Sequence, residues 1–443
     1  MKLKRVSLVL ASAALMTTVF TACQSNGGQP AGENNAAGGT SQQSGPIRID
    51  YWGGWTGPDL ETMKGLVEKF NAEQNKIHVE FSSMQWTPLF TKFLTEMRGG
   101  HPPDVLAMHP FELGQFVEMG VLDPKPVETA KLNKSDYSEF AWEGTFYKEK
   151  QYAVPLDVHM HGLFYNTELL AKAGITAPPK TGEELIAIGQ KLTVDKNGKH
   201  PNESGFDENN IVQYGLGFGM NHHSFYQVYA LINQQGGNPF TESMTKLELD
   251  EQKAAKAFGF LQDLIFKHKI VPKGQKSPVD DFTTGKVAMF IDGPWQMPKL
   301  EASNIKWGSA PYPQVFEKPA AWGAAEILTF PVNDKADPSQ KAAAVEFVQW
   351  LDKNINDWAK SGQLPSNNNG MEAAKKLPGR EAFVQSLDHS VLLPSHPKAT
   401  QLFSSTAPSP ILTAAQDAVL NNKDPLEIAR KLQADMNAIL ADR

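Results

Sequence analysis

The sequence predicts an α/β protein built from two lobes, and three observations lead to this prediction. Short apolar strand patterns alternate with amphipathic helix patterns along the chain, which is typical of layered α/β folds with largely parallel sheets. The chain has 443 residues, which is too long for one typical domain. No internal repeat is visible, and no apolar stretch after residue 20 approaches the length of a transmembrane helix.

The strand and helix patterns begin at residue 46. Residues 47–51 alternate apolar and charged side chains, as in a half-buried strand. Residues 60–70 carry an apolar stripe at helical spacing, with Asp59 as the expected cap. Further strands are expected over 77–81, 104–108, 163–165 and 287–291. Further helices are expected from Pro88 to 97, from 166 to Gly174, and over 181–192, 224–235 and 250–265, and the stretch from Ile411 is mostly helical.

Residues 1–22 have the parts of a secretory signal peptide. A basic segment that includes Arg5 precedes an apolar stretch over residues 6–20, which is too short to span a bilayer. Small residues then lead to Cys23, the only cysteine, in a pattern that resembles the bacterial lipobox, although Phe20 stands where Leu is usual. We predict cleavage before Cys23 and lipidation of its thiol. The alternative is an ordinary secretory signal followed by a chance cysteine.

The segment that follows is expected to be a tether. Residues 23–45 comprise Cys23 and a stretch rich in Gly, Ser, Asn, Gln and Ala, which cannot bury a core. A flexible coil of this length spans about 25 Å on average. It would hold an extracytoplasmic domain clear of the cell membrane in which the lipid is anchored, provided that more than one acyl chain is attached.

Charge and motifs exclude several other functions. The formal net charge is −7 and no basic stripe is present, so nucleic acid is not an expected partner. No nucleophile elbow or phosphate loop occurs, and the glycines at 215, 217 and 219 lack the third spacing of a dinucleotide loop. We therefore expect no cofactor.

Four segments together resemble the extracellular solute-binding protein family 1, whose best-known members bind maltose and other sugars. In chain order these segments are residues 51–55 (YWGGW), 103–107 (PDVLA), 163–170 (LFYNTELL) and 282–295 (FTTGKVAMFIDGPW). Their order and spacing carry the resemblance, which covers nearly all of the chain after the tether. It implies a two-lobed, periplasmic-binding-protein-like fold of type II, with hinge strands between lobes that close on ligand. The implied lobes are 46–157 plus about 312–365, and about 160–311 plus about 366–443.

The resemblance implies a monomeric receptor that captures a sugar or oligosaccharide and delivers it to an ABC transporter permease. Two alternatives remain open, namely a secreted glycosidase and a sugar sensor or adhesin without a transporter. A glycosidase needs two carboxylates that face each other across one bond. The candidate acids, which are Glu112, Asp157 and the Asp280-Asp281 pair, show no such pairing in the sequence. We therefore do not expect an enzyme.

A sugar site needs flat aromatic rings for the C–H faces and polar groups for the hydroxyls, placed beyond the carboxyl ends of strands. Trp52 and Trp55 follow the first strand in a glycine loop, although core packing is the alternative for either. His109 and Glu112 follow the third strand. The resemblance places polar sugar contacts in that loop, where the family often has Asp or Arg.

Five more candidates follow from the resemblance. Asp157 and His159 precede the strand at 163, where the chain is expected to cross between lobes; a hinge ion pair is the alternative. Tyr226 aligns with a family aromatic that stacks on sugar, and it could equally be a core residue. Trp295 matches a family stacking position, and Trp322 lies where the chain is expected to cross back.

Two patterns could suggest a metal site, and neither leads to a metal prediction. His159, His161, His222 and His223 lack a helix-spaced metal pair, so packed or solvated histidines are expected. Residues 195–210 loosely resemble a calcium loop but lack the closing glutamate at the right spacing. A polar surface insertion is favoured there, and a structural calcium ion stays an open alternative.

Overall fold

The computed structural model describes residues 45–240 and 244–442. The predicted signal peptide, the predicted lipidation site at Cys23 and the predicted tether lie outside the described residues, except for Gly45. Within the described part of the chain, no helix combines the length and the apolar character that crossing a membrane requires.

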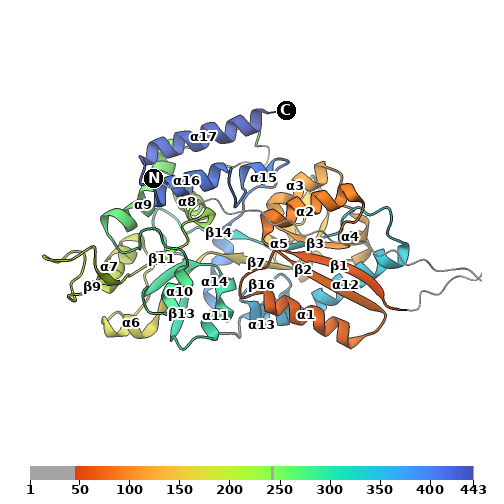
Figure 1. Ribbon diagram of the computed structural model, residues 1–443, viewed down its shortest axis with the longest axis horizontal. Helices are drawn as coiled ribbons and strands as arrows, with labels where there is room; N and C mark the ends of the chain where they lie inside the picture. Colours follow the sequence, from red (N-terminus) through yellow and green to blue (C-terminus); the bar gives the residue numbers. More distant parts are fainter. Residues whose placement is uncertain (1–44, 241–243, 443) are drawn as a thin grey trace, which may run out of the picture. The chain divides into compact units, whose positions relative to one another are not determined.

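A five-stranded sheet in the order β2-β1-β3-β15-β6 organises one half of the described chain (Figure 1). Its strands are β1 (Ile47–Gly53), β2 (Ile77–Ser83), β3 (Val105–Met108), β6 (Ala153–Pro155) and β15 (Ile327–Thr329). β1 runs parallel to β2 and β3, whereas β15 is antiparallel to β3 and β6. We call this sheet and the helices packed on it lobe 1.

Three long helices bury their apolar stripes against the lobe 1 sheet. They are α1 (Leu60–Glu73), α2 (Trp86–Gly99) and α12 (Pro338–Lys353). The stripe of α1 includes Met63 and Phe70, as the helical spacing predicts. Phe70 packs edge-on against Phe347 of α12, with ring centroids 5.1 Å apart, and Tyr51 of β1 joins the same core.

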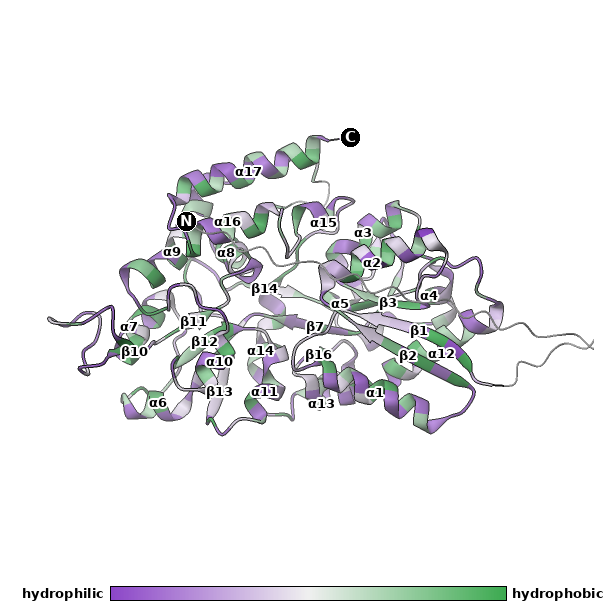
Figure 2. Cartoon of the chain, viewed as in Figure 1, coloured by the Kyte–Doolittle hydropathy of each residue, from purple (hydrophilic) through white to green (hydrophobic). Residues whose placement is uncertain are grey.

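A four-stranded sheet in the order β11-β12-β8-β13 organises the other half, which we call lobe 2. Its strands are β8 (Gly162–Asn166), β11 (Gly217–Phe218), β12 (Met289–Asp292) and β13 (Trp307–Pro311). The helices α8 (His222–Gln234), α9 (Glu251–Gln262), α16 (Pro410–Val419) and α17 (Pro425–Ala441) pack against one another in this half (Figure 1). Along α17, hydrophobic and hydrophilic residues alternate as expected for a helix with one buried face (Figure 2).

Both sheets are mixed, so the prediction of largely parallel sheets is wrong. β8 is antiparallel to β12 and β13, and β15 is antiparallel to both of its neighbours. Strands of one sheet that are joined by helical crossovers run parallel, as β1, β2 and β3 do. β8 and β15 instead enter their sheets directly from strands that cross between the two lobes, and they therefore run against their neighbours.

The crossing strands form a small sheet in the order β16-β7-β14-β17. They are β7 (Asp157–Met160), β14 (Ala321–Ala324), β16 (Leu364–Pro365) and β17 (Ser390–Val391). β7 connects β6 of lobe 1 with β8 of lobe 2, and β14 leads into β15 of lobe 1. β7 and β14 are antiparallel, with His159 opposite Ala324. Figure 1 shows β7 and β14 between the two larger sheets.

Shorter elements complete the described chain. The α-helices are α3 (Pro110–Glu118), α4 (Lys125–Ala130), α5 (Glu139–Glu143), α6 (Thr167–Lys172), α7 (Gly182–Leu192), α10 (Pro278–Thr283), α11 (Met297–Glu301), α13 (Asn368–Ala374), α14 (Glu381–Ser386) and α15 (Ala399–Leu402). Short 3₁₀ or π turns are η1 (Lys134–Asp136), η2 (Asp263–Lys267), η3 (Pro294–Gln296), η4 (Ile355–Ser361) and η5 (Leu387–His389). Two strand pairs are β4 (Phe146–Tyr147) with β5 (Lys150–Gln151), and β9 (Val194–Asp195) with β10 (Ile211–Gln213).

The insertion between β9 and β10 is organised by the carboxylate of Asp195. Its Oδ1 accepts hydrogen bonds from the backbone N–H groups of Asn197 and Lys199, both at 2.8 Å. Its Oδ2 accepts one from the N–H of Asp207 at 2.8 Å. Backbone N–H groups therefore donate to both carboxylate oxygens of Asp195. The side chain thus links separate parts of the loop, as a bound calcium ion does in a calcium-binding loop.

Candidate ligand-binding site

A cavity of about 540 Å³ lies among residues from lobe 1, lobe 2 and the crossing strands. This volume is within the range of small-molecule sites. The residues proposed from the sequence that line it are Trp55, His109, Glu112, His159, Tyr226, Trp295 and Trp322. Trp52 and Asp157 do not line it.

Trp55 forms part of the lobe 1 wall. The chain leaves β1 at Gly53, and the Trp55 indole packs edge-on against Trp86 of α2, with ring centroids 5.7 Å apart. Gly54 permits this approach because a Cβ at that position would collide with the Trp86 ring. The indole N–H of Trp55 is buried and has no hydrogen-bond partner among the described residues. The N–H is thus a free donor in a ring that lines the cavity.

Trp52 is a packing residue rather than a lining one. It lies in β1 next to Tyr51, so its side chain leaves the opposite face of the strand. There it joins a core cluster with Leu89 and Phe93 of α2. The Lys92 ammonium lies 4.1 Å from the centre of its ring, which covers the indole face.

His109 and Glu112 form a capping box at the start of α3. The Glu112 carboxylate accepts hydrogen bonds from the His109 backbone N–H at 2.9 Å, and its Oε2 lies 3.0 Å from Nδ1 of the imidazole. The His109 ring also stacks on Phe111, with an interplanar angle of 8°. These contacts hold the imidazole rigidly at the cavity wall.

Asp157 lies behind the cavity and joins the crossing strands to lobe 1. Its carboxylate accepts hydrogen bonds from the backbone N–H of Glu326 at 3.0 Å and from the indole N–H of Trp358 at 2.6 Å. Burial by itself would raise the pKa of Asp157, but the neighbouring side chains of Glu326, His159 and Trp358 outweigh burial and lower the pKa. The side chain has no exposed surface, so a ligand in the cavity cannot contact it directly.

Glu326 and His159 lie between Asp157 and the cavity. Nδ1 of His159 is 3.2 Å from Oε2 of Glu326 and 3.5 Å from Oδ1 of Asp157. The imidazole Nδ1 and Oε2 of Glu326 have no hydrogen bond of good geometry among the described residues. Burial and the charge of Asp157 raise the pKa of Glu326 well above its usual range. A proton taken up by this pair of carboxyl groups therefore goes to Glu326 rather than to Asp157, whose pKa is lowered.

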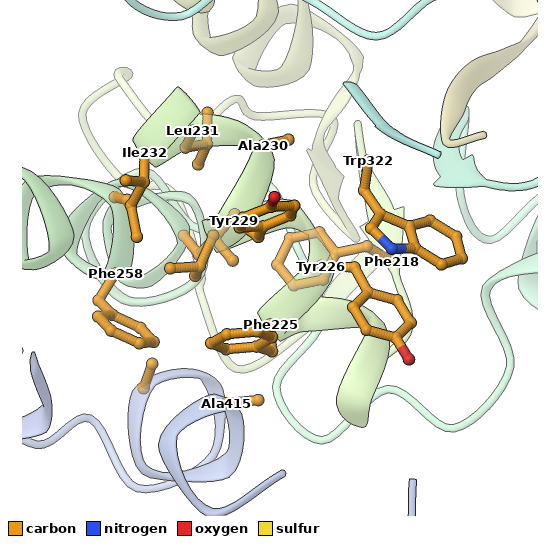
Figure 3. Close-up of a cluster of buried hydrophobic side chains, with 14 of the residues drawn as sticks. Phe218, Phe225, Tyr226, Tyr229, Ala230, Leu231, Ile232, Phe258, Trp322 and Ala415 are labelled. Atoms are coloured by element: carbon orange, nitrogen blue, oxygen red, sulfur yellow. The ribbon is translucent and has the colours of Figure 1, made fainter. Parts of the chain in front are cut away.

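Tyr226 and Trp322 form a stacked pair on the lobe 2 side. Tyr226 comes from α8 and Trp322 from β14, and their rings are parallel within 7° with centroids 4.2 Å apart. Figure 3 shows the pair at one edge of a buried cluster that includes Phe225 and Tyr229. The Tyr226 hydroxyl points away from that cluster in the same view. The pair thus belongs to the core and also lines the cavity.

Trp295 follows the carboxyl end of β12, within the turn η3. Gly293 lets the indole fold back over the chain, because a Cβ there would collide with the ring. Asp292 accepts hydrogen bonds from the Gly293 N–H at 2.8 Å and from the Gln296 amide at 3.0 Å, which orders the turn. Burial raises the pKa of Asp292 to about 7. Trp295 itself is only partly buried, so one face of it is available in the cavity.

Three histidines pack among Trp295, Tyr226 and Trp322, and two of them, His222 and His223, line the cavity. Nε2 of His161 lies 3.0 Å from Nδ1 of His223, and His222 packs beside His223. Burial lowers the pKa of His161 to about 3 and that of His222 to about 4, and neighbouring histidines add to both shifts. Burial also lowers the pKa of His223, and the imidazoles around it lower it further. All three rings are neutral at pH 7.

Asp59, Trp86 and Glu326 are among the lining residues that sequence reasoning missed. Asp59 was expected to cap α1, but its side chain makes no capping hydrogen bond and its Oδ1 has no partner among the described residues. Burial, with the charge of Asp157 adding to it, raises the pKa of Asp59 to about 6. A carboxylate directly after a Trp-Thr-Gly-Pro loop was the available signal for Asp59.

Family comparison places the chain among known proteins. Residues 54–354 match the family described as bacterial extracellular solute-binding protein. The chain belongs to this family. Of its relatives, the maltotriose-binding protein of Pyrococcus abyssi (strain GE5 / Orsay) is 23% identical over 409 residues, which is 90% of this chain and 81% of that protein. The maltodextrin-binding protein MdxE of Bacillus subtilis (strain 168) is 26% identical over 57% of this chain and 58% of its own length.

Solved structures share the fold of this solute-binding protein. The maltose/maltodextrin-binding domain from Bdellovibrio bacteriovorus bound to maltotriose superposes with a TM-score of 0.76 at 23% identity, over 89% of this chain and all of that one. An ABC substrate-binding protein from Listeria monocytogenes in complex with cycloalternan gives a TM-score of 0.76 at 20% identity, over 90% of this chain and all of that one. The fold is therefore the two-lobed, maltose-binding-protein-like α/β fold that the sequence predicts.

Proposed function

We propose that this solute-binding protein captures a carbohydrate between its two lobes and delivers it to the permease of an ABC transporter. One observation carries the proposal. Aromatic rings face the cavity from both lobes, with Trp55 and Trp86 on one side and Trp295, Tyr226 and Trp322 on the other. Aromatic faces suit the C–H faces of sugar rings, and the nearby imidazoles and carboxyl groups suit hydroxyls. The names of the relatives, which bind maltotriose and maltodextrin, support the same class of ligand.

The proposed contacts divide by chemistry. Trp55, Tyr226, Trp295 and Trp322 supply ring faces, of which Trp295 has the most accessible one. His109 and His159 supply hydrogen bonds to sugar hydroxyls. Glu112 orients the His109 ring, and Asp157 stabilises the crossing strands. Trp52 stabilises the wall from behind, against α2.

A thermal-shift screen against mono-, di- and trisaccharides tests the proposal. A ligand that binds only the native state raises the melting temperature by mass action, and at 100 times its Kd it adds about 2.7 kcal/mol. We expect at least one carbohydrate to do so, and calorimetry to give one site per chain. If no carbohydrate class shifts the melting temperature, the proposal is wrong.

The same samples separate binding from cleavage. A receptor returns the oligosaccharide unchanged after prolonged incubation, whereas a glycosidase shortens it. Chromatography of the recovered sugar distinguishes the two, and new reducing ends would favour the enzyme.

We also propose that the protein is a monomeric lipoprotein whose lobes comprise 46–157 with 312–365, and 160–311 with 366–443. The basic, apolar and small-residue sequence that ends at Cys23 supports a lipid anchor. Mass spectrometry of the protein from native membranes should find a modified Cys23 at the N-terminus. An unmodified thiol there, or cleavage at another bond, would contradict the anchor.

A further inference from the structure

The cavity has an unbalanced charge. Three of its lining residues carry carboxyl groups, namely Asp59, Glu112 and Glu326, and Asp157 lies directly behind Glu326. Among the described residues that line the cavity, none is a lysine or an arginine. A buried carboxylate without a counter-charge is unfavourable, so native proteins normally pair such groups. Glu112 is paired with His109, and Glu326 lies 3.2 Å from Nδ1 of His159, so Asp59 is the carboxyl group whose pairing is left to the contents of the cavity.

Two of these carboxyl groups keep an oxygen free. Oδ1 of Asp59 and Oε2 of Glu326 are buried and have no hydrogen-bond partner among the described residues. Both residues are at least nine-tenths buried, with relative exposures of 5% and 3%. Glu112 differs, because its carboxylate is engaged by the backbone and ring of His109. Asp59, whose side chain has neither a hydrogen bond nor an ion pair among the described residues, is therefore the first acceptor that a ligand would satisfy.

Two imidazoles in the cavity, those of His222 and His223, do not oppose a cation at neutral pH. The pKa of His222 is lowered to about 4, and the pKa of His223 is lowered as well. Aromatic rings add to the attraction, because the faces of Trp and Tyr rings stabilise a cation through their quadrupoles. Trp55, Trp295 and the Tyr226–Trp322 pair supply such rings in the cavity.

We infer that the carbohydrate taken by this cavity carries a protonated amine, so that an amino sugar binds more tightly than the neutral sugar of the same stereochemistry. This inference rests on the proposed function and narrows its ligand class. The ammonium group would lie against Asp59 and Glu326, and the sugar ring against the aromatic walls. A sugar acid would place its carboxylate among these acids and would bind most weakly.

Matched pairs of sugars test the inference without knowledge of the natural ligand. The pairs are glucose and glucosamine, galactose and galactosamine, mannose and mannosamine, and cellobiose and chitobiose, each titrated by calorimetry at pH 7. An amine of ordinary basicity is largely protonated at this pH. In each pair that binds, we expect the amine to bind at least about ten-fold more tightly, and N-acetylation of that amine to remove the gain.

Variants locate the charge that is responsible. Asp59→Asn keeps the size of the side chain. It should reduce the affinity for the amino sugar about ten-fold, so that the amino sugar and the neutral sugar bind with similar affinity. Asp59→Ser should act in the same direction and replaces Asp59→Asn if that variant fails to fold. Asp388→Asn makes the same charge change at an exposed site outside the cavity and should keep the full preference.

The outcomes that overturn the inference differ from those that overturn the proposed function. Neutral sugars that bind as tightly as their amines would end the inference and leave carbohydrate binding intact. A rise in the melting temperature of the wild type, but not of Glu326→Gln, when calcium or zinc ions are added alone would show that these carboxylates bind a metal ion. That result would also overturn the inference. If no sugar of either kind binds, both proposals are wrong.

Discussion

At the scale of single residues, the cavity separates side chains that face a ligand from side chains that only hold the wall. Trp295 and Trp358 illustrate the difference. Trp295 is partly exposed in the cavity, whereas Trp358 is fully buried and donates its indole N–H to Asp157. Loss of the Trp295 ring should weaken ligand binding, and loss of the Trp358 ring should lower the stability of the fold.

Trp295→Ala should weaken binding of the carbohydrate found in the screen by about ten- to several-hundred-fold, or about 1.4–3.5 kcal/mol. The reason is that a rigid ring stacked on a sugar contributes both burial and aromatic contact. Calorimetry measures the affinity, and a melt without sugar measures the fold. Trp350→Ala is the matched control, because that partly buried Trp of α12 lies outside the cavity. Normal affinity with a collapsed melting temperature would show that Trp295 is a packing residue.

Asp59→Asn should stabilise the unliganded protein at pH 8 by up to about 3 kcal/mol, because a pKa raised from 3.8 to about 6 corresponds to about two pKa units. The sign follows from linkage. A carboxyl group whose folded pKa is raised favours the folded state most below its unfolded pKa, and this contribution falls as pH rises through about 6. The difference between variant and wild type should therefore grow between pH 4 and 6 and stay constant above pH 7.

Unfolding in denaturant at pH 4, 6 and 8 measures this difference. Asp388→Asn controls for the change in net charge, because its side chain is exposed. A pH-independent difference for Asp59→Asn would show that its carboxyl group is solvated in the unliganded protein.

At the scale of elements, one carboxylate links a crossing strand to two other segments of the chain. Asp157 begins β7, and its hydrogen bonds reach η4 through Trp358 and the β14–β15 connection through Glu326. One side chain thus joins three segments that are far apart in the sequence. The aromatic and imidazole groups of the cavity depend on these segments, because β7 carries His159 and β14 carries Trp322.

Asp157→Asn should lower stability more than it lowers affinity. An Asn side chain keeps one acceptor but turns an amide N–H₂ toward the donors of Trp358 or Glu326, which leaves at least one buried group unpaired. The expected loss is about 1.5–3 kcal/mol, as for a hydrogen bond to a charged group. Denaturant unfolding and calorimetry are compared on the same protein, with Asp250→Asn, an exposed cap of α9, as the control. A large loss of affinity with unchanged stability would make Asp157 a ligand contact.

At the scale of the whole molecule, two lobes joined by short crossing strands are suited to hinge motion. A ligand that contacts both lobes stabilises the closed arrangement by its differential affinity for the two states. The cavity meets this condition, since Trp55 and Trp86 belong to lobe 1 and Tyr226 and Trp295 to lobe 2. Closure therefore follows from the site if the ligand engages both walls.

Small-angle scattering should record a smaller radius of gyration at saturating carbohydrate than without it. The change should be absent in Trp295→Ala at concentrations that saturate only the wild type, and it should return when that variant is saturated. A radius that does not change at saturation would show that ligand binds without closing the lobes.

Much of this protein was determined by local sequence. β1, α1, β2 and the helix from Thr181 follow apolar periodicity and turn residues, because burial of one face and satisfaction of end groups are decided within about 15 residues. The carboxyl-end loops after β1, β3 and β12 were also foreseeable, and Trp55, His109 and Trp295 line the cavity from them.

The tertiary structure alone decided the rest. The direction of β8 and β15 depends on the crossing between lobes, which no local pattern encodes. Trp52 and Trp55 share one loop motif, yet the alternation of β1 turns Trp52 toward α2. Asp59 and Glu326 are 267 residues apart in the sequence, and they line one cavity only because the chain crosses back through β14. Long-range contacts determine these features, because desolvation and charge depend on which neighbours the fold brings together.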